Sequence, residues 1–410
     1  NGSGEGGIAF IDDFEGAKTP YDLTRAPLTW TMSSTPQQFK ADAASKGLQN
    51  GYHRAKMAWY NIDNIFYRTN NGLPGDYGQA IVNSHFERSI TQKELFPNQD
   101  LNVAVTNIPT LDLAFYPSER GAYNFNPVLD TAGHLTDPSA NWAGITKAIK
   151  NNIDFDNANI QYIEFWMLSP YINPSHGNTQ IDGTPFKLSN NGKLYFNLGS
   201  ISEDVLPDNV QSFENGLPGA DTTVWGLIST EQYITNAFNN DPNTRPQQDI
   251  GLDGLNDDQE GKQFSNYVGL LSLSAKNAVG TDICADNFKY YLGAEQDALT
   301  ILQRYKKYNL TQNNSPINAG ASITPSSSNY PDNEDLNQDN NLNTVEEYYE
   351  YEIDIDKSKF VIGENYIVSS RDYIINDSKN IADTVTWYQF RIPIRTPNAV
   401  IGNIQGYKSI

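Results

Sequence analysis

Apolar residues in this chain recur mostly at every second position, in short runs that are separated by polar stretches rich in Asn, Gly and Pro. In residues 385–394, the apolar side chains of Tyr388, Phe390, Ile392 and Ile394 alternate with polar residues and one proline. A period of two predicts a half-buried strand, and the proline at position 393 indicates an edge or a bulge. Residues 163–168 are apolar at both parities apart from Glu164, which predicts a central strand covered on both faces.

Further strands are expected where β-branched and aromatic residues condense, at residues 8–14, 160–168, 193–198 and 399–407, and residues 347–353 could continue as one. Apolar residues at helical spacing predict short helices at residues 139–150 and 294–308. A proline in the second position, followed by good helix formers, predicts another at residues 35–48. The long polar stretches between them, above all residues 311–334, are typical of loops or linkers.

These segments predict a mainly β protein, built as an antiparallel jelly-roll-like β-sandwich of the galactose-binding or carbohydrate-binding-module type with long insertions. Strands 160–168 and 193–198 should be inner strands, with 385–394 returning beside them, because none of these runs could bury its apolar side chains alone. We expect one large discontinuous domain over residues 1–410, with residues 207–345 the richest in loops.

Charge and cysteine content limit the classes of partner and the kinds of cross-link that this chain can have. The formal net charge is −21, so the surface should repel phosphate backbones, and nucleic acid is an unfavourable partner. A single cysteine, Cys284, cannot form an internal disulfide, and we expect it to be a small buried side chain. No apolar run approaches the roughly 18 residues of a membrane helix. The sequence starts without Met and ends abruptly, which we interpret as a region of a longer chain.

Two acidic segments fit the twelve-residue loop that binds calcium in EF-hands. The first-choice set follows the ligand spacing closely, with Asn340 at the turn that needs a positive φ: Asp335, Asn337, Asp339, Asn341, Asn343 and Glu346. The second-choice set lacks one ligand and has Gly254 at the turn: Asp249, Asp253, Asp257 and Glu260. Either segment could instead be a solvated acidic turn. Calcium bound here would be structural.

A third, weaker metal candidate lies near the start of the chain, where strand alternation places Asp13 and Glu15 on one face. These two carboxylates could bind a metal, act as an acid and base pair, or hydrogen-bond to nearby loops.

Nothing in the sequence nominates a catalytic site. The four histidines stand singly, and no nucleophile elbow or phosphate-binding loop is present. Of the six tryptophans, Trp166 and Trp387 should be core residues. Trp59 and Trp225 are better candidates for an exposed sugar-binding platform, although residues of this kind are more often packing residues than ligand contacts. We therefore expect a protein without enzymatic activity.

Seven phrases occur in an order that resembles the SprA (Sov) family, the outer-membrane translocon subunit of the Bacteroidetes type 9 secretion and gliding machinery. They are FIDDFEG at 10–16, ERGAYNFNP at 119–127, YIEFWM at 162–167, KLYFNLGSISEDVL at 193–206, FENGLP at 213–218, DIGLDGL at 249–255 and PDNEDLNQDNNLNTVEE at 331–347. The family's barrel segments are not recognisable, so the chain is similar to a non-barrel region of that protein.

The resemblance implies a structural role in a channel that exports folded cargo and supports gliding motility. It implies a PorV-like shuttle protein, a plug protein and secreted cargo as partners, and an outer-membrane location, with membrane contact only through the rest of the full-length chain. Calcium clips of modest affinity favour the extracellular side. The alternatives from other classes are a calcium-stabilised carbohydrate-binding module and a glycan-processing enzyme with two carboxylates about 5–10 Å apart.

Overall fold

The computed structural model describes residues 21–23, 29–68, 84–97, 107–151, 153–171, 180–181, 184–185, 192–214, 221–230, 237–239, 241–309, 331–376 and 382–410. The strand expected at 8–14, the pair Asp13 and Glu15, and most of the linker expected at 311–334 lie outside these residues.

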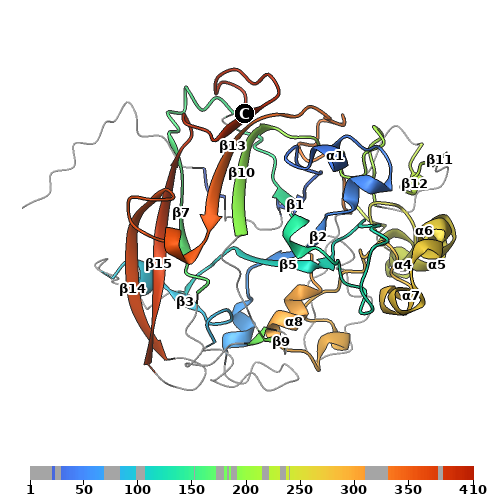
Figure 1. The fold of residues 1–410 in the computed structure, drawn as a ribbon, viewed down its shortest axis with the longest axis horizontal. Helices are drawn as coiled ribbons and strands as arrows, with labels where there is room; N and C mark the ends of the chain where they lie inside the picture. The colour runs from blue at the N-terminus through green and yellow to red at the C-terminus, as the bar shows by residue number, and fades with distance from the viewer. Residues whose placement is uncertain are drawn as a thin grey trace, which may run out of the picture.

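Two three-stranded antiparallel sheets form a β-sandwich, which lies on the left of Figure 1. The first sheet has the order β14 (Ile367–Asn376), β15 (Ala382–Pro393) and β7 (Tyr162–Leu168). The second has the order β10 (Gly192–Ser200), β13 (Glu347–Ile355) and β16 (Ala399–Ile401). One apolar cluster contains side chains from both sheets, and Phe165 of β7 lies 5.4 Å from Phe196 of β10 between ring centroids.

The alternation in β15 is confirmed. Phe390 and Ile392 are fully buried, while Arg391 between them is exposed. Register pairs Phe390 with Phe165 of β7, and their rings stack at 5.0 Å. The predicted pairing of residues 385–394 with 160–168 is therefore confirmed, and the proline falls on the last residue of the strand.

The prediction that β7 and β10 are inner strands is wrong in the part of the chain that the structure describes. Each stands at the edge of its sheet, and Glu164 of β7 is exposed. The strand covered on both faces is β13, where Tyr349, Tyr351 and Ile353 face the sandwich core. On its other face Tyr348 is fully buried. Its hydroxyl oxygen accepts a hydrogen bond from the backbone N–H of Gln37 at 3.1 Å.

A second apolar core lies beside the sandwich. It is built around the two-stranded ribbon of β2 (Ala55–Tyr60) and β5 (Asp112–Arg120) and the short helix α8 (Ile301–Lys306). Helices α4 (Arg245–Gln248), α5 (Asp257–Gln263), α6 (Ser265–Leu270) and α7 (Leu273–Val279) gather at the right of Figure 1. Side chains from α6 and α7, together with Phe264 between α5 and α6, complete this core.

The remaining elements are short. The strands are β1 (Thr31–Met32), β3 (Ile90–Thr91), β4 (Asn107–Ile108), β6 (Ile145–Thr146), β8 (Gln180–Ile181), β9 (Thr184–Pro185), β11 (Asp221–Thr222) and β12 (Leu227–Ile228). The α-helices are α1 (Lys40–Ala43) and α3 (Gln92–Leu95). The 3-10 turns are Leu48–Gly51, Asn64–Tyr67, Pro138–Ala140, Pro242–Thr244, Ala294–Gln296 and Lys357–Lys359. None of the helices in the described ranges is long and apolar enough to cross a membrane.

The helix predicted at 139–150 is wrong, because its backbone groups pair with other segments. The N–H of Trp142 donates to the carbonyl of His53, and the carbonyl of Trp142 accepts from Ala55. Residues Ile145–Thr146 then form strand β6 against β1. Tertiary pairing outweighs the weak helical spacing here.

The other two predicted helices are shorter than expected. In residues 35–48 only Lys40–Ala43 is helical, because the Asn50 amide donates to the carbonyls of Asp42 and Ser45 and takes the place of the next turn. In residues 294–308, Thr300 starts a new helix with a capping box to Gln303.

Candidate metal centre

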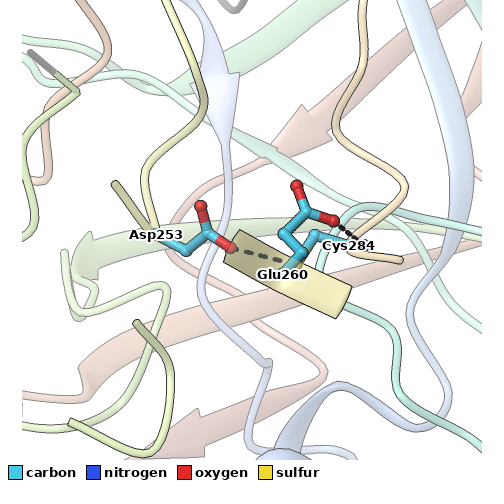
Figure 2. Close-up of side chains that lie close together, drawn as sticks. All are labelled: Asp253, Glu260 and Cys284. Atoms are coloured by element: carbon cyan, nitrogen blue, oxygen red, sulfur yellow. Dashed lines mark hydrogen bonds between the residues drawn. The ribbon is translucent and has the colours of Figure 1, made fainter. Parts of the chain in front are cut away.

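Four carboxylates converge beside the only cysteine, in the second core. Glu260, Asp282 and Asp286 each offer an oxygen, and these three atoms all lie within 4.8 Å of one another. Asp253, Glu260 and the Cys284 sulfur form a second group that meets the same limit, and Figure 2 shows these three side chains turned toward each other. Because Glu260 belongs to both groups, we treat the four carboxylates as one acidic cluster.

Three separate segments supply the cluster. Asp253 lies in the loop between α4 and α5, Glu260 lies on α5, and the other two carboxylates flank Cys284 in the loop after α7. The α5 helix is set by a capping box between Asn256 and Gln259. Gly254 has a φ of +66°, so the turn expected from its sequence position is present.

Gly251 permits the close approach of this loop to the cluster. Its φ is +91°, and a Cβ atom at this position would lie 2.2 Å from Oδ2 of Asp286. Only glycine fits without a shift of the backbone or of the carboxylate.

Hydrogen bonds connect the segments through the cysteine. The backbone N–H of Cys284 donates to Oε2 of Glu260 at 2.8 Å, and its thiol donates to Oδ2 of Asp253 at 2.9 Å. The carbonyl of Cys284 accepts from the N–H of Tyr123. Cys284 is buried as predicted, and its thiol acts as a donor.

The cluster concentrates negative charge away from water. Burial, followed by repulsion from neighbouring carboxylates, raises the pKa of Asp253 and Asp286 well above the usual range. Burial also raises the pKa of Glu260 to about 7. Within the described residues, none of the four carboxylates makes an ion pair with Lys, Arg or His.

The second-choice calcium set is divided by the fold. Asp253 and Glu260 belong to the acidic cluster, but Asp257 accepts hydrogen bonds from Thr281 and Asn287 at 2.9 Å each. Asp249 lies near Glu214, and repulsion from Asp249 adds to the burial that raises the pKa of Glu214. Sequence reasoning missed Asp282 and Asp286, whose only local signal is their spacing of four.

The first-choice loop wraps around a glutamate that the sequence reasoning did not select. Oε1 of Glu203 accepts from the N–H of Leu336 at 2.9 Å, and Oε2 accepts from the N–H of Asn343 at 3.1 Å. Asp335 accepts from the N–H groups of Asp339 and Asn340.

Asn340 has a φ of +63°, as expected for the turn of such a loop. Asp339 accepts from the N–H of Asn341, and the amide of Asn337 donates to Asp339. Glu346, the last member of the set, accepts from the N–H of Ser202 at 3.3 Å and has its pKa raised to about 7 by burial.

The structure places the two tryptophans that were the best candidates for a sugar-binding platform in the interior, which agrees with the alternative that they are packing residues. Trp59 and Trp225 are both buried in the second core, and the indole of Trp59 donates to the carbonyl of Trp30. Three histidines lie in the described part: His53 contacts Asp42, His134 contacts Asp130, and His85 bonds to the carbonyl of Ser169. They stand apart, as the sequence indicated.

A large open cleft separates the sandwich from the β2–β5 ribbon. Its volume is about 3310 Å³, and β5, β7 and β10 contribute to its lining. Large apolar side chains on these three strands are exposed along it: Leu113, Phe115, Tyr162 and Tyr195.

The chain was compared with curated proteins and with models of protein families. No curated protein matches the chain. Residues 263–410, which include strands β13 to β16 and the Cys284 loop, match a family described as motility related/secretion protein, SprA_N. This match confirms, over residues 263–410, the resemblance noted in the sequence.

Proposed function

We propose that this chain is a structural interaction region of a protein-secretion translocon in the outer membrane, which supports export of folded cargo and gliding motility without catalysis. The observation that carries the proposal is the open cleft between the sandwich and the β2–β5 ribbon. The family match over residues 263–410 supports a role in motility and secretion.

The cleft has the properties of a protein-binding surface. Within the described residues, β7 and β10 each pair on one side only, so both border the cleft as edge strands with free backbone groups. Exposed aromatic and aliphatic side chains stand beside these edges. An extended segment can add to such an edge through backbone hydrogen bonds while its side chains contact the apolar residues.

The buried chemistry argues for the absence of catalysis. Burial raises the pKa of the Cys284 thiol well above its ordinary value, so the reactive thiolate is disfavoured. Catalysis needs a nucleophile, a base and a charge stabiliser that meet around a substrate. The described histidines lie apart, and the acidic cluster is buried.

By family resemblance, the proposed partners are a PorV-like shuttle, a plug protein and secreted cargo. The proposed location is the outer membrane, with this region facing the cell exterior. Calcium at the loop of Asp335 to Glu346 is part of the same proposal, because that loop turns at Asn340 in the manner its spacing predicts. A jelly-roll topology is likewise a proposal, which the two facing sheets support.

The cleft can be tested by introducing charge on β5. We would replace Leu113 and Phe115, which are 45% and 46% exposed, by Asp in the full-length protein in its native cell. The matched control replaces Ile374 and Val400, which are 69% and 53% exposed and lie outside the cleft, by Asp. Protein level, cargo in the medium and colony spreading are the readouts.

We expect the cleft variant to lose cargo export and spreading at unchanged protein level, and the control to retain both. Export at the unmodified level in the cleft variant contradicts the proposed role of this surface. Turnover of glycans, peptides or esters by the purified chain, abolished by Asp13→Ala with Glu15→Ala while folding is retained, contradicts the non-catalytic part.

A further inference from the structure

One oxygen of the acidic cluster has no hydrogen-bond donor. Oδ2 of Asp286 is buried, the residue is only 2% exposed, and no group in the described chain donates to this atom in hydrogen-bond geometry. A buried carboxylate oxygen without a donor is destabilising by about 1–3 kcal/mol or more. Asp286 also supplies one oxygen to the group formed with Glu260 and Asp282.

The spacing of the three oxygens suits one metal ion. Ca²⁺ binds oxygens at about 2.3–2.6 Å, so two oxygens on opposite sides of one ion lie roughly 5 Å apart. The oxygens of Glu260, Asp282 and Asp286 all lie within 4.8 Å of one another. No rearrangement of the backbone is required to bring them to a shared ion.

We propose that Glu260, Asp282 and Asp286, with Asp253 beside them, form a binding site for one calcium ion. The site extends beyond the loops selected from sequence, because two of its ligands come from the segment after α7. It is independent of the proposed role in secretion.

The donor types favour calcium over zinc. Zinc sites are built from cysteine thiolates and histidine nitrogens. In this cluster the sulfur of Cys284 carries a proton that it donates to Asp253, and the group of Glu260, Asp282 and Asp286 holds only carboxylates. Several carboxylate oxygens in a flexible arrangement suit Ca²⁺, whereas Mg²⁺ demands a tighter octahedron and retains water.

A bound ion would fasten three segments at one point. It would hold the loop of Asp253, helix α5 and the Cys284 loop together, next to the contact between Cys284 and Tyr123. It would also neutralise carboxylates that otherwise repel one another. The alternative is that the cluster simply keeps protons at neutral pH and binds no metal.

Cys284 provides a built-in reporter of the ion, because it is the only cysteine in the sequence and is fully buried. A thiol reagent reaches it only when the surrounding segments open. The purified chain, stripped of metal with EGTA, would be titrated with CaCl₂ by calorimetry, and labelling of Cys284 would be timed with and without Ca²⁺. MgCl₂ and ZnCl₂ serve as comparison arms.

The variants are Asp286→Asn, Asp282→Asn and the control Asp258→Asn, which alters an exposed neighbour on the same helix as Glu260. A further variant, Asp335→Asn with Asp339→Asn, separates this site from the other acidic loop. Asp282 is only partly buried, and an asparagine there keeps the acceptor for the N–H of Asp286. This variant therefore gives the same test if Asp286→Asn does not fold.

We expect Ca²⁺ to slow labelling about tenfold or more in the unmodified chain, the Asp258→Asn control and the Asp335→Asn/Asp339→Asn variant. In Asp286→Asn and Asp282→Asn, Ca²⁺ affinity should fall about tenfold or more and the protection of Cys284 should be lost. Protection by Ca²⁺ that persists in both of these variants overturns the proposal. So does an unmodified chain whose labelling responds to Zn²⁺ or Mg²⁺ but not to Ca²⁺.

Discussion

The β-sandwich and the loops beside it satisfy their backbone polar groups in different ways. In the sandwich, N–H and C=O groups pair between strands, and the interior is aromatic and aliphatic. In the loops at 201–214, 249–260, 282–286 and 331–343, buried carboxylates accept backbone N–H groups instead. Glu203, Glu214 and Glu334 each hold two segments together in this way.

This difference explains why a chain with a large acidic excess contains so many buried acids. A buried N–H needs an acceptor, and a loop has no neighbouring strand to supply one. A carboxylate provides two acceptor oxygens, so one Glu can bridge two distant loops. Such a link carries a desolvation penalty, which appears as the raised pKa of Glu214 and Glu334.

The largest expected effect comes from removing an aromatic ring from the sandwich core. Phe390 is fully buried and stacks on Phe165, so Phe390→Ala should lower the free energy of unfolding by about 3–5 kcal/mol. Denaturant unfolding measures it, with Ile374→Ala on an exposed position of β14 as the control. A loss below about 1 kcal/mol would contradict a well-packed sandwich.

The acceptor role of the loop carboxylates is tested at Glu334. Its two oxygens accept from the N–H groups of Leu206 and Ser212 at 2.9 and 2.7 Å. Glu334→Leu leaves both donors buried without an acceptor and should cost about 2–4 kcal/mol. Glu334→Gln keeps one acceptor oxygen, so it should cost roughly half as much. Equal losses for the two variants, from denaturant unfolding, would contradict the acceptor role.

A smaller effect on stability concerns pH: titration of His85, which bonds to the end of β7, and titration of the buried acids in the loops should change the free energy of unfolding in opposite directions. Burial lowers the pKa of His85 to about 4, and its ring nitrogen bonds to the carbonyl of Ser169 at the end of β7. The folded pKa lies below the ordinary 6.5, so its stability contribution is present above pH 6.5 and is lost as the pH falls toward 4. Buried acids with raised pKa values have the opposite sign and lose their contribution as the pH rises.

The His85 contribution is isolated by comparison with His85→Asn, which does not titrate. Between pH 7.5 and pH 5 the unmodified chain should lose on the order of 1–2 kcal/mol relative to this variant, with allowance for the partial exposure of the ring. Unfolding at both pH values measures the difference. A difference of zero would mean that His85 is not desolvated in the folded chain.

Local patterns predicted the strands well, because alternation is a property of neighbouring residues. Strands β7, β10, β13 and β15 lie where β-branched and aromatic residues condense, and the burial of Cys284 and the turn at Asn340 were also expected. The helix predicted at 139–150 is wrong because the backbone of Trp142 hydrogen-bonds to His53 and Ala55, which are distant in the sequence. The burial of Trp59 and Trp225 could not be read from local sequence for the same reason, because it depends on distant segments that form the second core.

The sequence by itself therefore determined the β-rich class, the positions of the main strands, the acidic loops and, through its ordered phrases, the resemblance that the family match over residues 263–410 supports. Only the tertiary structure decided which strands are edges, that Glu203 occupies the centre of one acidic loop, and that Asp282 and Asp286 join Asp253 and Glu260. The physical reason is the separation along the sequence over which each interaction acts. Alternation and turn chemistry act between neighbours, whereas a cluster of buried carboxylates depends on segments that meet only after the chain has packed.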